Sequence, residues 1–313
     1  MRISSLSYLT SSLSSMQNNQ ASIARLSQQI ASETRILTPK DDPLAAGKAV
    51  DLSNRIALRG QHLANQQKAD ITLKYESTVL TAMRGVLEQV TQQITGLGPN
   101  QSPELRNQYA AMVSGAYLQA KDLANTRDPE GRYIFGGFET TAPPFAHVQA
   151  YGTAVTDSPK TTYGGTAYVS ATSPDGVRSI EVATGRNIQV SDNLDVMFQS
   201  NQADDILETL DQLAVDLSGA TTQGQLDTAL TKITAALTAL GNMESRIGAA
   251  QVELEEVGTI TSSLRLEEQN ALSDLLQLDK AAAIVELQSR QTSLEAAQRA
   301  YAQTSRLSLF SYL

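Results

Sequence analysis

The chain has 313 residues, with 33 acidic residues against 24 basic ones and neither Cys nor Trp. The absence of Cys excludes a disulfide framework, a Cys-based zinc site and a thiol nucleophile. A net charge of −9 disfavours both a nucleic-acid partner and an anionic membrane surface, because each attracts Lys and Arg. Charged residues make up only 18% of the chain, against about 25% in ordinary soluble domains. We therefore expect other protein to cover much of this surface.

The first predicted helix begins near the N-terminus, in the charge-free residues 3–24. Ser, Thr, Asn and Gln fill more than half of this stretch, so we expect neither a membrane span nor a cleaved signal peptide. One heptad row is apolar throughout and consists of Leu9, Met16, Ile23, Ile30 and Leu37. The alternate row begins with Leu6 and Leu13 and is then weakened by Gln20, Ser27 and Thr34. This pattern predicts a coiled-coil-like seam.

Helices are also predicted through the middle of the chain. Asp42 and Pro43 have the residue types of an N-cap and a first helical position, which predicts a helix over 43–94. Pro103 starts a second helix that ends before Asp128, and two more helices are expected over 203–217 and 223–240. Together with the lower part of the C-terminal helix they predict a bundle.

A short β region interrupts these helices. Tyr133 to Phe135 are strand formers followed by Gly136 and Gly137, which predicts a hairpin within 128–145. Farther on, Ile180 alternates with Val182 and Ile188 with Val190, around a turn at 184–187 that contains Gly185. We expect residues 146–196 to form a small β domain.

The C-terminal residues 247–306 contain no Pro and predict a last helix. Along one face of it recur Ile284, Leu287, Leu294 and Tyr301. The two ends of the chain therefore predict a matched pair of helices. We expect these four residues to pack subunits together with six positions of the N-terminal helix. The six are Leu6, Leu9, Leu13, Met16, Ile23 and Ile30. Spacing alone is equally compatible with packing within one chain, and both kinds of packing can coexist.

No residue cluster predicts catalysis, a cofactor or a metal. Asp41 and Asp42 are adjacent, have no neighbouring His and are explained by helix capping. His62 lies in a Gln-rich helix and His147 lies beside two Pro residues. The glycines near residue 131 fit neither nucleotide-binding motif. We therefore do not expect an enzyme.

The predicted fold class is mainly α, with paired terminal coiled-coil helices, a long helical bundle and a small inserted β domain. The terminal packing region comprises 1–40 and 280–313, the bundle with its hairpin 41–145 and 197–279, and the β domain 146–196.

Four segments resemble the FlgL family of flagellar hook-filament junction proteins, also called hook-associated protein 3. They are the opening MRISSLSYLTSSLSSMQNNQASIARLSQQIASETRI, the block TPKDDPLAA, the segment DPEGRYIFGGFETTAPPF and the ending SLFSYL. Members commonly have Gly followed by Lys or Arg where this chain has Glu33 and Thr34. Flagellin shares the paired terminal helices and is the alternative, but it typically ends differently. A coiled-coil surface adhesin is a more distant alternative, because it should carry a secretory signal or membrane anchor.

The resemblance implies a structural adaptor between the hook-associated junction and the flagellin filament. Its implied partners are copies of itself in a ring, the other junction protein FlgK, flagellin and the export chaperone FlgN. It also implies type III export without a cleaved signal peptide, and a location at the hook-filament junction of the bacterial flagellum. Phe310 and Leu313 are implied contacts for the chaperone, which binds the C-terminal region in this family.

Overall fold

The computed structural model describes residues 2–98, 101–138, 140–141, 176–192, 194, 206–219 and 221–310. The side chains of residues 2–6, 8, 9 and 304–310 lie outside this description. The chain forms two compact units. Unit 1 comprises residues 1–60 and 263–313, and unit 2 comprises residues 61–262.

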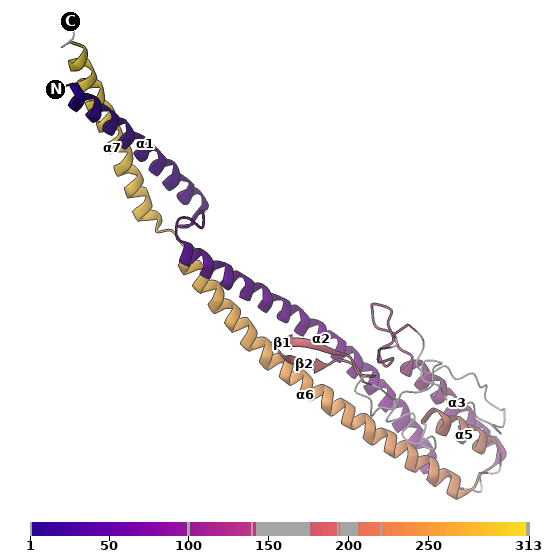
Figure 1. The fold of residues 1–313 in the computed structure, drawn as a ribbon. Helices are drawn as coiled ribbons and strands as arrows, with labels where there is room; N and C mark the ends of the chain where they lie inside the picture. The colour runs from indigo at the N-terminus through magenta and orange to yellow at the C-terminus, as the bar shows by residue number, and fades with distance from the viewer. Residues whose placement is uncertain are drawn as a thin grey trace. The chain divides into compact units, whose positions relative to one another are not determined.

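Helices dominate the described residues, which confirms the predicted, mainly α fold (Figure 1). They are α1 (Arg2–Ser32), α2 (Pro43–Thr95), α3 (Pro103–Ala124), α5 (Ile206–Ser218), α6 (Gln223–Leu276) and α7 (Lys280–Phe310). The predicted starts of α2 and α3 are confirmed by their caps. Asp42 Oδ1 accepts a hydrogen bond from Ala45 N at 3.0 Å, and Ser102 Oγ accepts one from Leu105 N at 3.3 Å. Over the part of the chain that the structure describes, no helix is long and apolar enough to cross a bilayer.

Helix α6 differs from the sequence prediction, which ended a helix at residue 240 and began the next at 247. The helix instead runs without interruption through Gly241. A Cβ atom at Gly241 would lie 3.4 Å from the guanidinium of Arg84, so this glycine accommodates a neighbouring side chain. The break comes at residues 277–279, where Asp279 Oδ1 accepts a hydrogen bond from Ala282 N at 3.0 Å and caps α7.

Unit 2 contains the hydrophobic core. Within it, α2 and α6 run antiparallel, because Arg84 pairs with Glu244 at 2.6 Å while Gln66 donates to Thr261 Oγ1 at 3.2 Å. Helix α3 packs on α5. The largest fully buried side chains include Leu73, Leu80, Met83, Leu87 and Ile94 of α2, and Ile206, Leu207 and Leu210 of α5. This packing supplies most of the stability of a helical bundle.

The predicted hairpin around Gly185 is confirmed. Strands β1 (Ser179–Ala183) and β2 (Arg186–Gln189) pair antiparallel, with Ile180 opposite Ile188. Gly185 has a φ of 73°, a value that glycine adopts at little cost. The amides of Asn65 and Gln66 donate to the carbonyls of β1 at 2.8 and 2.7 Å, which fastens the hairpin to α2. Residues 146–175, 193, 195 and 196 of the predicted β domain lie outside the described residues.

The segment 126–138 contains a correction. A strand is predicted over Tyr133 to Phe135, but Ile134 and Phe135 form turns. Tyr133 makes an isolated bridge with Arg127, which is the only pairing among the described residues of this segment. The strand prediction failed because local polar groups bond this segment to itself. Asp128 accepts hydrogen bonds from the backbone N–H groups of Glu130 and Arg132, both at 2.9 Å.

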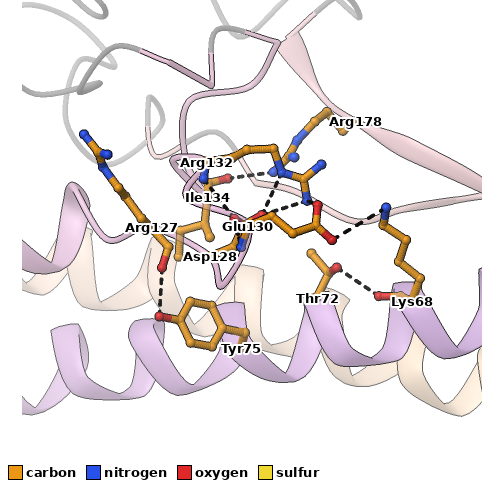
Figure 2. Close-up of polar contacts among 9 residues, drawn as sticks. All are labelled: Lys68, Thr72, Tyr75, Arg127, Asp128, Glu130, Arg132, Ile134 and Arg178. Atoms are coloured by element: carbon orange, nitrogen blue, oxygen red, sulfur yellow. Dashed lines mark hydrogen bonds and ion pairs between the residues drawn. The ribbon is translucent and has the colours of Figure 1, made fainter.

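Figure 2 shows how this segment is held on α2. The Arg132 guanidinium pairs with Asp128 at 2.7 Å, and Tyr75 donates its hydroxyl hydrogen to the Arg127 carbonyl at 2.9 Å. Lys68 and Glu130 form a longer ion pair of 3.9 Å. Burial would raise the pKa of Asp128, but the hydrogen bonds and charge from Arg132 outweigh it and lower the pKa. The segment is thus a self-bonded cap that inserts Phe135 into the core.

Phe135 and Phe138 form a matched pair for testing this cap, since they are 0% and 63% exposed. Phe135→Ala should lower the free energy of unfolding by about 3 to 5 kcal/mol, because it leaves a cavity in the core. Phe138→Ala should change it by less than about 0.5 kcal/mol. Urea denaturation followed by far-UV circular dichroism measures both. Equal losses would contradict this assignment of the cap.

Candidate assembly interface

The terminal helices α1 and α7 pack against each other within unit 1 (Figure 1). They run antiparallel, since Lys280 pairs with Glu33 at 2.7 Å while Arg290 reaches Asn19 at 3.5 Å. One row of half-buried residues on α1 recurs at alternating spacings of four and three and consists of Ser12, Met16, Asn19, Ile23, Leu26 and Ile30. On α7 the row with this spacing is Ala283, Leu287, Arg290, Leu294, Ala297 and Tyr301. Such spacing is typical of a coiled-coil seam.

The predicted packing residues divide into two groups. Those that fall on the seam are half-buried and are Met16, Ile23, Ile30, Leu287, Leu294 and Tyr301. Leu13 and Ile284 lie off the seam and are 46% and 45% exposed. Leu6 and Leu9 belong to α1 and Phe310 belongs to α7, but their side chains lie outside the described part of the chain. Leu313 lies wholly outside the described residues.

The seam includes residues that the sequence analysis did not select. The second row of α1 runs through Ser12, Asn19 and Leu26, one position before the row that begins with Leu6 and Leu13. Two of these three residues are polar, so a search for apolar heptads missed them. The signal available in the sequence was Leu26, which lies three residues after Ile23 and four before Ile30.

Unit 1 buries very little apolar surface. Among its described side chains, the only fully buried apolar residues are Ala45 and Ala283. Several larger apolar side chains of this unit are instead exposed, and they are Leu13, Leu44, Val50, Leu58, Leu266, Ile284 and Val285. Full burial of a Leu or Ile side chain is worth about 1.5 to 3 kcal/mol. Unit 1 therefore leaves much of its available hydrophobic stabilisation unused.

Backbone hydrogen bonds join the connection that follows α1 to the connection that precedes α7. Arg35 N donates to the Leu276 carbonyl at 2.8 Å, and Leu278 N donates to the Glu33 carbonyl at 3.3 Å. The buried side chain of Gln29 donates to the Arg35 carbonyl at 2.5 Å. These bonds fix where each terminal helix enters the pair.

Two carboxylates stabilise the connection between α1 and α2. The backbone N–H of Thr38 donates to Asp41 at 3.1 Å, and this bond, helped by Leu37 N–H and the Arg25 charge, outweighs burial and lowers the pKa of Asp41. In Asp42, the hydrogen bond from Ala45 N lowers the pKa in the same way. Both groups are therefore ionised at neutral pH. Asp42 caps α2, as the sequence predicts, whereas Asp41 accepts hydrogen bonds from the turn that precedes this helix.

Glu33 follows the last residue of α1 with a φ of 57°, in the left-handed region where side chains are strained. This is the position where members of the resembled family commonly have Gly. In this chain the ion pair with Lys280 offsets part of that strain, although both side chains are largely exposed and such pairs contribute at most about 1 kcal/mol.

Comparison with known proteins gives three findings. The profile of the bacterial flagellin N-terminal helical region matches residues 3–140. Over 327 aligned residues, covering 99% of each chain, the protein is 28% identical to flagellar hook-associated protein 3 of Escherichia coli K12. Its fold is similar to a putative flagellar hook-associated protein from Vibrio parahaemolyticus, with a TM-score of 0.65, 18% identity and coverage of 76% of this chain and 100% of that one.

The fold is also similar to that of the flagellar junction protein FlgL from Legionella pneumophila. That comparison has a TM-score of 0.56 and 16% identity, and covers 74% of this chain and 100% of that one.

The first finding shows the class of proteins to which residues 3–140 are similar, those with a flagellin-type N-terminal helical region. Within this class, the full-length likeness is to flagellar hook-associated protein 3, which confirms the family resemblance drawn from the sequence motifs. Its relatives are junction proteins of the flagellum. Flagellin, the alternative, shares the N-terminal region, whereas the hook-associated proteins match from end to end.

The strain at Glu33 can be separated from its ion pair with two variants. Glu33→Gln removes the charge and keeps the strain, whereas Glu33→Gly removes both. We expect α1 in the Gly variant to be more stable than in the Gln variant by about 1 kcal/mol. Hydrogen exchange of the α1 amides in the full chain should show several-fold stronger protection for Glu33→Gly. Equal protection in the two variants would contradict a strained backbone at this position.

Proposed function

We propose that this protein is a structural adaptor that joins the hook-associated junction of the flagellum to the flagellin filament, and that it assembles through its terminal helices. The observation that carries this proposal is the near absence of buried apolar residues among the described side chains of unit 1. Neighbouring subunits would supply the apolar contacts that the unit does not make for itself.

The charge distribution also supports assembly through the terminal helices. Between Arg2 and Arg25 the chain carries no ionisable Asp, Glu, Lys, Arg or His side chain, although a helix facing water normally carries charges beside its seam. Burying residues 3–24 against other protein costs no desolvation of ionised side chains. The seam residues hold α1 and α7 together, and the exposed residues around them, such as Leu13 and Ile284, face other subunits.

The partners follow from this role. Copies of the chain form a ring, which contacts the other junction protein FlgK on one side and flagellin on the other. The protein reaches this location in the flagellum by type III export, without a cleaved signal peptide and bound beforehand by the chaperone FlgN. Helices of this kind gain most of their stability from packing, so the terminal helices order fully only on assembly. The role requires no catalysis, cofactor or metal.

Charges placed on the apolar row of α1 test whether assembly requires the pair of terminal helices. Cells whose only copy carries Leu9→Asp with Ile23→Asp should lose the filament and motility, because two carboxylates would enter an apolar contact. The middle of the chain should stay folded, and helicity of the purified variant measures this. Leu9→Met with Ile23→Leu is the matched control and should assemble normally. Normal motility and filament attachment in the Asp variant would contradict the proposal.

The chaperone contact has a separate test. Removal of residues 280–313 should abolish capture of the chain by immobilised FlgN, and Phe310→Ala with Leu313→Ala should weaken capture at least tenfold. The loss would reflect apolar contacts made before export, when the C-terminal helix is unpaired. Unchanged capture of the truncated chain would refute this role and leave the assembly proposal standing.

A further inference from the structure

A buried pair of carboxyl groups lies where the β hairpin meets the helices of unit 2. Glu76 belongs to α2 and is 1% exposed, and Asp192 follows β2 and is 6% exposed. The backbone N–H of Asp192 donates to Glu76 Oε1 at 2.6 Å. Burying two acidic groups together is costly when both are ionised, so the pair requires an explanation.

Cations surround this pair incompletely. Arg246 of α6 forms an ion pair with the Asp192 carboxylate, and Arg178, which precedes β1, adds positive charge near Glu76. Gln189 donates to Asp192 Oδ1 at 3.2 Å. Glu76 Oε2 is buried and has no hydrogen-bond partner among the described residues. A bare, buried carboxylate oxygen is unfavourable, whereas a protonated carboxyl group tolerates the site.

The protonation state follows from these contacts. Burial and then the neighbouring Asp192 raise the pKa of Glu76 to about 8, against opposing contributions from the Asp192 N–H, Arg246 and Arg178. Burial also raises the pKa of Asp192, but Arg246 opposes this increase. The ion pair with Arg246 favours the negative charge on Asp192, so the proton of the pair belongs on Glu76.

The pair holds both ends of the hairpin. Arg178 N donates to Ser191 Oγ at 2.9 Å, and Val190 N donates to the Arg178 carbonyl at 2.8 Å. The segments 176–178 and 190–192 are thus tied to each other, and Asp192 connects them to α2 through Glu76 and to α6 through Arg246. All of these residues belong to unit 2.

We propose that Glu76 and Asp192 form a pH-sensitive clasp, which holds the β hairpin on α2 and α6 while one carboxyl group is protonated and releases it when both are ionised. The sign follows from linkage. A folded-state pKa above the model value of 4.5 gives stability that is complete below that value and decreases as pH rises. The decrease ends near the folded-state pKa of about 8, so release belongs to mildly alkaline solution.

Distance measurement between two spin labels tests this clasp in the full chain. The natural chain has no Cys, so Gln67→Cys on α2 and Thr184→Cys in the exposed hairpin turn accept one label each without competition. We expect a single narrow distance distribution at pH 6. As pH rises towards 8 a second, broad component should appear, and it should level off above pH 8 while overall helicity is kept.

Two variants identify the groups responsible. Glu76→Gln should keep the narrow distribution from pH 6 to pH 9.5, because the neutral amide cannot ionise. Asp192→Asn should do the same, because it removes the second negative charge and leaves Arg246 facing Glu76. Glu88→Gln changes an exposed acid on the same helix and should keep the alkaline broadening. A narrow distribution in the unsubstituted pair throughout this pH range, or equal broadening in Glu76→Gln, would overturn the proposal.

Discussion

Unit 1, the terminal unit, leaves large apolar side chains exposed, and this exposed surface is the main constraint on how the unit can be stabilised. Two helices of 31 residues each, α1 and α7, meet along one half-buried seam, and Ala45 and Ala283 are the fully buried apolar residues described in their unit. A single seam satisfies one stripe of each helix and leaves the remaining faces in water. Contacts with other chains would bury these faces, and exposed apolar surface of this kind favours association.

Unit 2, in contrast, buries its apolar side chains in a core of its own. Its helices, the β1–β2 hairpin and the self-bonded segment around Phe135 enclose a continuous core, and ion pairs such as Arg84 with Glu244 fix the alignment of α2 and α6. A bundle of this kind folds on its own packing. Unit 2 thus buries a core of its own, whereas the described part of unit 1 leaves large apolar side chains exposed. This contrast agrees with the proposal that the terminal helices serve assembly.

The sequence predicted most of what depends on local chemistry. The caps at Asp42 and Ser102, the hairpin around Gly185 and the apolar row through Met16, Ile23 and Ile30 were all recoverable from residue type and spacing. Two predictions failed, at a helix end and at a strand. Gly241 lies within α6 and does not end it, and its missing side chain leaves room for Arg84 from another helix. Tyr133 to Phe135 do not form a strand, because Asp128 bonds the segment to itself.

Two features of the sites had no local signal. The polar residues of the seam, Ser12 and Asn19, become recognisable only once α7 is beside α1. Glu76 and Asp192 are separated by more than one hundred residues, and only the fold brings them together. The left-handed backbone at Glu33 was signalled by the resemblance, since glycine is common there, but its ion pair with Lys280 was not.

The central claim is that other subunits cover the exposed apolar faces of the terminal unit. Labelling of a single introduced thiol, Leu13→Cys, tests it most directly, because the natural chain has no other Cys and residue 13 lies outside the seam. The account predicts rapid reaction with a maleimide in the free protein and at least tenfold slower reaction in assembled flagella. Equal reaction rates in the two states would show that this face remains in water and would contradict the account.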